Sequence, residues 1–142
     1  VRRSGSVEQF IKDYKIDNGI MYSCVKNHVP FVLTGSIRDD GPLPEVYGDV
    51  YEGAAAMREL VKKSTTVICL ATMLHTIATG NMTPSFRVMP DGRIRPVYLY
   101  TVDADEFVVN KLLDRGSLSA TTIVTNVQDF ITIVAKGLGV IK

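Results

Sequence analysis

Hydrophobic and polar positions along this chain switch repeatedly between a helix-like and a strand-like period. Ser6 can cap a helix over residues 7–14, and a second helical stretch follows over 20–26. Runs of β-branched and apolar residues predict four strands, at 31–33, 65–71, 97–102 and 121–124. Amphipathic stretches predict four further helices, at 50–63, 72–78, 104–114 and 127–136.

This alternation of strands and helices predicts the fold class. Parallel neighbouring strands need a crossover connection, which a helix supplies. Right-handed crossovers are then expected to place helices on both faces of the sheet. We therefore predict a single α/β domain over residues 1–142, with a doubly wound, mostly parallel, Rossmann-like sheet of about four strands.

Composition narrows the function classes. The chain has 142 residues, of which 46% are hydrophobic and 22% charged, enough for one globular domain with a core. A net charge of +1 argues against a nucleic-acid partner, which normally needs a basic face. The apolar run at 66–73 is far shorter than the roughly 20 residues that span a bilayer.

The cysteines bear on the cellular compartment, and the first residues bear on whether the chain is part of a longer protein. Cys24 and Cys69 lack metal-ligand spacing, so we predict no metal and read them as reduced thiols of a cytoplasmic protein. Cys69 lies inside a predicted core strand, where packing is its expected role. The opening sequence VRRSGS has no initiator Met and resembles the interior of a longer protein. We therefore expect an N-terminal companion segment or chain.

A charged loop follows the first predicted strand. It holds Arg38, Asp39, Asp40, Gly41, Pro42 and Pro44. A buried strand that opens into a charged loop stiffened by Pro and Gly is how open α/β sheets present a ligand site. The carboxylates of Asp39 and Asp40 suit a cationic substrate, although they could instead only solvate the loop.

Polar residues also follow the other three strands. Thr72 and then His75 come after the second strand, Asp103 after the third, and Asn126 after the fourth. Because carboxyl ends of parallel strands share one edge, these three segments and the charged loop after the first strand are expected to converge on one crevice. Asp103 can accept hydrogen bonds from the ribose of a dinucleotide, or it can cap the helix that begins at 104.

The Gly80-Asn81 pair after the second strand also has two possible roles, one in binding a cofactor and one in the fold. Gly80 and Asn81 could let the backbone approach a cofactor, or they could simply end the predicted helix. No GxGxxG motif follows any strand, so the standard dinucleotide fingerprint is absent.

Three sequence blocks carry a family resemblance: VRRSGS, CVKNHVPFVLTGSIRDDGPLPEV and LATMLHTIATGN. They resemble the archaeal-type ornithine cyclodeaminases, also called the LOR/SDH-domain family. The resemblance covers most of this chain but only the C-terminal part of the family's protein. The family's domain is similar to deoxyhypusine synthase, which implies an NAD-binding α/β fold. It also implies a redox-neutral conversion of L-ornithine to L-proline and ammonia, in which bound NAD takes a hydride from the α-carbon and later returns it.

That chemistry implies roles for particular residues. It needs a carboxylate near the δ-amine, a base for the α-amine and a dry pocket for nicotinamide. Asp39 and Asp40 are the candidates for the first role, and Lys26 or His75 for the second if burial lowers its pKa. The expected cofactor contacts are Gly80, Asn81, Met82, Thr83, Asp103, Asn126 and Val127. A small amino acid is the expected substrate, and a homo-oligomer the expected assembly.

Two alternatives stay open at this level. The first is another NAD-using amino-acid or polyamine enzyme, such as a saccharopine-type dehydrogenase or a deoxyhypusine-synthase-like transferase. The transferase would need a nucleophilic lysine, for which Lys26 and Lys111 are the candidates. The second alternative is a non-catalytic module that binds NAD or an amino acid within a larger assembly.

Overall fold

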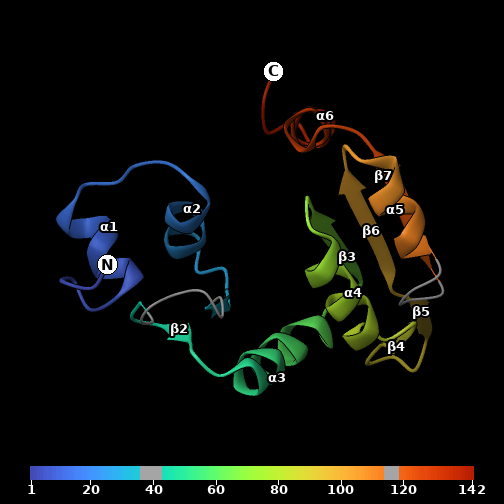
Figure 1. The fold of residues 1–142 in the computed structure, drawn as a ribbon, viewed down its shortest axis with the longest axis horizontal. Helices are drawn as coiled ribbons and strands as arrows, with labels where there is room; N and C mark the ends of the chain where they lie inside the picture. Colours follow the sequence, from blue (N-terminus) through green and yellow to red (C-terminus); the bar gives the residue numbers. More distant parts are fainter. Residues whose placement is uncertain (36–42, 114–118) are drawn as a thin grey trace. The chain divides into compact units, whose positions relative to one another are not determined.

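The computed structural model describes residues 1–35, 43–113 and 119–142. The chain divides into two compact units, Val1–Met57 and Arg58–Lys142, and each is described by itself (Figure 1). The prediction of a single domain stays a prediction. In the described residues, no helix is long and apolar enough to cross a membrane.

The first unit joins two short helices to a pair of very short strands. Its elements are α1 (Val7–Asp13), α2 (Ile20–Lys26), β1 (Leu33–Thr34), β2 (Val46–Tyr47) and the beginning of α3 (Val50–Val61). Ser6 Oγ accepts a hydrogen bond from the Gln9 amide at 3.0 Å, so Ser6 caps α1 as predicted. The Val7 amide donates to Glu45 Oε2 at 2.7 Å, which ties the start of β2 to the start of α1.

The strand predicted at 31–33 differs from expectation in position and in partner. The structure places a two-residue strand at Leu33–Thr34, and it pairs in parallel with Val46–Tyr47. It does not join the larger sheet of the second unit, so that sheet has three described strands instead of about four. The physical reason is local: Val46 lies close in sequence to Leu33, and closing a short loop costs little chain entropy.

The second unit is built on a parallel sheet. Its strands are β3 (Thr66–Leu70), β6 (Tyr98–Asp103) and β7 (Ala120–Val124), in the order β3-β6-β7. These are the other three strands that the sequence predicts, each shifted by no more than one residue at either end. The central strand carries the core, since Leu99 and Val102 are at most 1% exposed.

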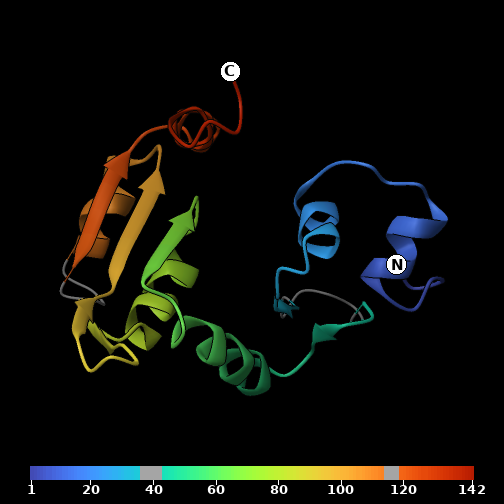
Figure 2. The same ribbon diagram turned by 180° about the vertical axis from the view of Figure 1, so that it is seen from behind.

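Two helices connect these strands and cover one face of the sheet. They are α4 (Met73–Met82) and α5 (Glu106–Leu113), and both views show them on the same side of the strands (Figures 1 and 2). The sequence predicts helices on both faces, whereas these two connecting helices share one face, because β3-β6-β7 advances in one direction and right-handed crossovers then fall on the same side. α6 (Val127–Gly137) follows β7 beyond the carboxyl edge.

α4 runs further than its sequence predicts. The pattern ends the helix at 78, before Gly80 and Asn81, whereas the structure continues it to Met82. A glycine inside a helix costs only about 1 kcal/mol relative to alanine, and burial of Thr76, Thr79 and Gly80 opposes that cost. Pro84, two residues beyond the last helical residue, is where the helix could not continue.

The stretch between α4 and β6, predicted only as turn-rich, forms a β-hairpin. Its strands are β4 (Phe86–Val88) and β5 (Ile94–Pro96), paired antiparallel. Gly92 has a φ of +80°, which closes the Pro90-Asp91-Gly92 turn, and the Met89 amide donates to the Arg93 carbonyl at 2.8 Å.

Candidate functional site

The carboxyl ends of β3, β6 and β7 meet at one edge of the sheet. The Ala71 amide, just after β3, donates to the Val102 carbonyl of β6 at 2.9 Å. The Thr125 amide, just after β7, donates to the Asp103 carbonyl at 2.9 Å. These two bonds fix the segments that follow the three strands side by side. The convergence predicted for these three segments is therefore confirmed.

Asp103 is the carboxylate at the centre of this edge. Its Oδ1 accepts a hydrogen bond from the Asp105 amide at 2.9 Å, and Asp105 Oδ1 in turn accepts one from the Phe107 amide at 2.9 Å. Asp105 is therefore the residue that caps α5, and Asp103 only shapes the turn before it. Asp103 is half-buried, and its Oδ2 makes no hydrogen bond within the described residues. One carboxylate oxygen is thus free to accept from a ligand hydroxyl.

The turn from β3 into α4 is the second part of the site. Ala71 has a φ of +51°, an uncommon conformation for a residue with a side chain. Thr72 stands at the N-cap of α4 but makes no capping bond, because its Oγ1 lies 3.1 Å from His75 Nδ1. The first amides of α4 therefore have no side-chain acceptor in the part of the chain described. Free amides at a helix N-terminus favour an anionic group.

The sequence predicts Thr72 among the polar residues of the crevice but gives it no individual role. The available signal was its place immediately before an apolar helical run, where threonine usually caps the helix. Only the structure shows that its hydroxyl turns to the imidazole instead.

Asn126 and Val127 complete the edge. Asn126 Oδ1 accepts from the Gln128 amide at 2.8 Å, so Asn126 caps α6, and Val127 is the first residue of that helix. The bond from Thr125 to Asp103 holds both residues close to the aspartate. Of the predicted cofactor residues, the structure therefore brings Asp103, Asn126 and Val127 together.

Gly80, Asn81, Met82 and Thr83 lie elsewhere in the unit. They end α4, which begins at the carboxyl edge and returns toward the amino ends of the strands, about 15 Å away for a ten-residue helix. Gly80 and Thr83 are buried, and Thr83 Oγ1 donates to the Thr79 carbonyl at 2.7 Å. Their role as cofactor contacts stays a prediction, and it would require the ligand to reach that end of α4.

None of the four predicted catalytic residues lies in a described, buried site. Asp39 and Asp40 lie outside the described residues. Lys26 ends α2 in the first unit, with its Nζ 5.3 Å from the centre of the Tyr22 ring. Lys26 and His75 are both exposed, so the described residues do not supply the burial that a base role calls for.

Two further sequence candidates have ordinary structural roles. Lys111 Nζ lies 4.1 Å from the centre of the Phe107 ring, a cation–π contact on the surface of α5. Cys69 is buried in β3 as predicted; burial raises the pKa of its thiol, and hydrogen bonds with Thr76 and Thr79 offset part of that rise. Neither arrangement activates a nucleophile.

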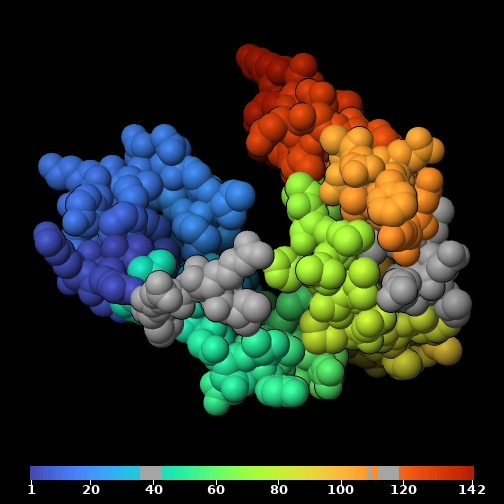
Figure 3. All heavy atoms as spheres, in the orientation of Figure 1, coloured from blue at the N-terminus to red at the C-terminus, as the bar shows by residue number. Residues whose placement is uncertain are grey.

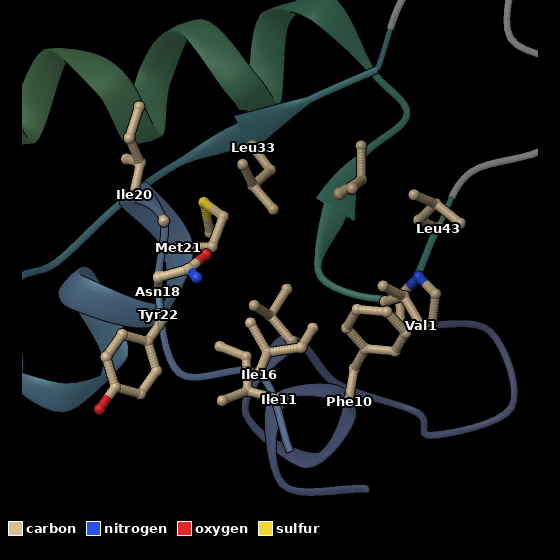
Figure 4. A pocket seen from close by; sticks show the side chains of 14 residues that line it. Val1, Phe10, Ile11, Ile16, Asn18, Ile20, Met21, Tyr22, Leu33 and Leu43 are labelled. Atoms are coloured by element: carbon tan, nitrogen blue, oxygen red, sulfur yellow. The ribbon is translucent and has the colours of Figure 1, made fainter. Parts of the chain in front are cut away.

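A cavity of about 420 Å³ lies within the first unit, between α1, α2 and the strand pair (Figure 4). Apolar side chains such as Phe10, Ile11, Met21 and Leu33 surround it, and Asn18 adds one amide. None of the described residues that line it has a charged side chain, so these residues by themselves do not suit a charged amino acid. Across the described parts of the chain, no three His, Cys, Asp or Glu side chains gather in a way that could hold a metal ion.

Comparison with known proteins places this geometry in a family. Residues 1–134 match the family described as arginine dihydrolase ArgZ-like, C-terminal, Rossmann fold. The ornithine cyclodeaminase of Methanothermobacter thermautotrophicus is 48% identical over 133 residues, which are 94% of this chain and 30% of that protein. The chain thus spans about a third or less of the curated relatives it matches.

Solved structures agree with this placement. A LOR/SDH protein of Methanococcus maripaludis, 38% identical, superposes with a TM-score of 0.82 over 96% of this chain and 38% of its own. The complex of AgrE with ornithine and NAD⁺, 37% identical, superposes with a TM-score of 0.82 over 98% of this chain and 19% of its own. AgrE is the name of a bifunctional arginine dihydrolase/ornithine cyclodeaminase of Nostoc. The resemblance to archaeal ornithine cyclodeaminases and the Rossmann-type fold predicted from the sequence are both confirmed. This chain belongs to the ArgZ-like C-terminal Rossmann-fold family.

Proposed function

We propose that this chain is the cofactor-binding part of an NAD-dependent ornithine cyclodeaminase, which converts L-ornithine to L-proline and ammonia. The observation that carries the proposal is Asp103, a carboxylate with one free oxygen, held between the uncapped start of α4 and Asn126 at the carboxyl edge of the sheet. Ligands of open α/β sheets bind at this edge. Relatives named ornithine cyclodeaminase, and a related structure with ornithine and NAD⁺, give the chemistry.

The residues at the edge fit a dinucleotide. Asp103 Oδ2 is placed to accept hydrogen bonds from ribose hydroxyls, and the free amides at the start of α4 suit the pyrophosphate. The amide nitrogen of Asn126 is left free by the cap and can donate to the ligand. When bound, NAD supplies the acceptor for the hydride of the substrate α-carbon and gives the same hydride back, so the overall reaction is redox-neutral.

The substrate contacts are drawn from the remaining predicted residues. Asp39 and Asp40 would bind the cationic δ-amine and orient it toward the α-carbon, where it displaces ammonia as the ring closes. His75 would take the proton of the α-amine, with Thr72 fixing its ring through Nδ1. Lys26 is the alternative base.

Activity is proposed for the longer protein that carries this chain. The match covers only 30% of one curated relative and 18% of another, and an exposed His75 needs other parts of the protein to exclude water from it. We further propose a homo-oligomer, a location in the cytoplasm, and proline as the biosynthetic product.

A pair of isosteric substitutions tests the proposal. Asp103→Asn keeps an Oδ1 that can accept from the Asp105 amide, so the turn is retained while the charge facing the ligand is lost. A hydrogen bond to a charged group contributes about 1.5–3 kcal/mol, so NAD affinity should fall about 10- to 150-fold. Asp105→Asn is the matched control, because asparagine caps a helix as well as aspartate does.

The readouts are the NAD dissociation constant by calorimetry and proline formation from ornithine in the full protein. Unchanged NAD affinity in Asp103→Asn would remove Asp103 from the cofactor site. Bound NAD without any conversion of ornithine would instead favour the non-catalytic module.

A further inference from the structure

The β4–β5 hairpin projects at the amino ends of the strands, at the opposite end of the sheet from the proposed cofactor site, and nothing in the proposed function uses it (Figure 1). Its two faces differ in chemistry. Phe86, Val88 and Ile94 share one face and are 55%, 69% and 68% exposed. Arg87 and Arg95 stand directly opposite each other on the other face. The hairpin lies at the surface of the second unit (Figure 3).

The basic face carries uncompensated charge. Like charges directly opposite on neighbouring strands destabilise a hairpin. Arg87 donates to the Lys63 carbonyl at the end of α3, so its charge meets no carboxylate there. Arg95 is exposed and forms no ion pair within the described residues. Arg93, by contrast, is neutralised by Asp91, with Nε 2.6 Å from Oδ2. Two arginines are thus held together, and among the described residues neither has a carboxylate partner.

The backbone of the hairpin leaves one edge able to pair. Met89 with Arg93, and Ser85 with Val97, form hydrogen-bonded pairs across the hairpin. In an antiparallel ladder such pairs alternate with pairs whose N–H and C=O groups point outward. Phe86 and Val88 are therefore the residues of β4 with outward groups. Among the described residues, these groups have no backbone partner. The outer edge of β5 is blunted by Pro96, which has no N–H.

We propose that β4 binds an extended segment of a partner protein by strand addition, and that this segment alternates apolar with acidic residues. Successive side chains of an added strand point to opposite faces. Its apolar residues would therefore contact Val88 and Phe86, while its carboxylates would pair with Arg87 and Arg95. A single added strand of this kind would contact both faces of the hairpin and would also hydrogen-bond to the outward backbone groups of β4.

Other occupants fit less well. A second copy of this chain paired through β4 would set Arg87 of one copy beside Arg87 of the other, which like-charge repulsion opposes. A nucleic acid would meet the arginines, but on the apolar face only Phe86 offers a ring on which a base can stack, so Val88 and Ile94 would stay in water.

The test uses the full chain and a fluorescent seven-residue peptide in which Glu alternates with Val, titrated by anisotropy. Saturable binding is expected, weakening about tenfold between low and high salt. A peptide with Lys in place of Glu should not bind. Arg95→Glu should weaken binding of the acidic peptide about tenfold or more, the loss of one charge-assisted contact. Lys136→Glu, an equal charge change on exposed α6, should leave it unchanged.

A second variant examines the backbone contact. Val88→Pro removes an outward N–H without removing a ladder hydrogen bond, so the hairpin can persist while binding is lost. If Val88→Pro does not fold, Arg95→Glu still tests the proposal, because Arg95 is exposed and its substitution should leave the fold intact. The proposal fails if the acidic peptide does not bind, if Arg95→Glu has no effect, or if a single-stranded oligonucleotide of equal charge binds more tightly than the peptide.

Discussion

Gly53 allows α3 to lie close to β1, and replacing it tests that contact. A Cβ added at Gly53 would lie 2.7 Å from Thr34 Oγ1 and 3.0 Å from Thr34 Cγ2. Both residues belong to the first unit, and β1 leads into the loop that contains Asp39 and Asp40. The close approach therefore concerns the strand that directly precedes the proposed substrate residues.

Two opposing effects determine the magnitude. Alanine in place of glycine inside a helix stabilises by about 1 kcal/mol. Overpacking against a β-branched side chain with little rotational freedom costs about 1–3 kcal/mol. Gly53→Ala alone should therefore change the free energy of unfolding by between about 0 and 2 kcal/mol in the destabilising direction.

Removing the obstructing atoms should reverse the sign. Thr34→Ala removes the two closest atoms and leaves Thr34 Cβ at 3.4 Å from the new methyl, an ordinary contact. In that background Gly53→Ala should stabilise by about 1 kcal/mol, so the coupling energy of the double-mutant cycle is about 1–3 kcal/mol. Urea unfolding followed by circular dichroism measures all four proteins. A full stabilisation of about 1 kcal/mol by Gly53→Ala with Thr34 present would refute the reasoning.

The remaining predictions concern the core, a cap and the thiols. Leu99→Ala should destabilise by about 2–5 kcal/mol, since Leu99 is 1% exposed, whereas Leu74→Ala at 73% exposure should stay within about 0.5 kcal/mol; urea midpoints compare them. Ser6→Ala should lower the free energy of unfolding by about 1 kcal/mol, because α1 loses its cap. Hydrogen exchange should show this as a faster rate at the Gln9 amide. Dithionitrobenzoate at pH 8 should label half-buried Cys24 faster than Cys69, and equal rates would contradict the packing of β3. Because burial raises the pKa of Cys69 above its unfolded value, its contribution to stability is full below the unfolded pKa and is lost as pH rises toward the folded one; Cys69→Ala should flatten that alkaline slope.

Local sequence patterns determined most of the elements. Runs such as TTVICLA and VYLYTV are apolar and β-branched, and they form β3 and β6 within one residue of the predicted bounds. The Ser6 cap and the Pro90-Asp91-Gly92 turn also act through neighbouring residues. Features whose energy comes from nearby residues can be predicted from sequence. The family blocks likewise lie in continuous sequence, which is why the resemblance was visible there.

Tertiary structure alone decided the pairings and the partners of polar atoms. The strand near Phe31 pairs with Val46–Tyr47, since its two residues find a nearer partner than the large sheet. Gly80 stays inside α4 because burial of that helix face outweighs the cost of a glycine. The Thr72 hydroxyl lies within hydrogen-bond distance of His75, and Asp105 instead of Asp103 caps α5. In each case two alternative hydrogen-bond partners compete, and the tertiary structure decides between them. Such competitions depend on three-dimensional distances, which the order of residues does not contain.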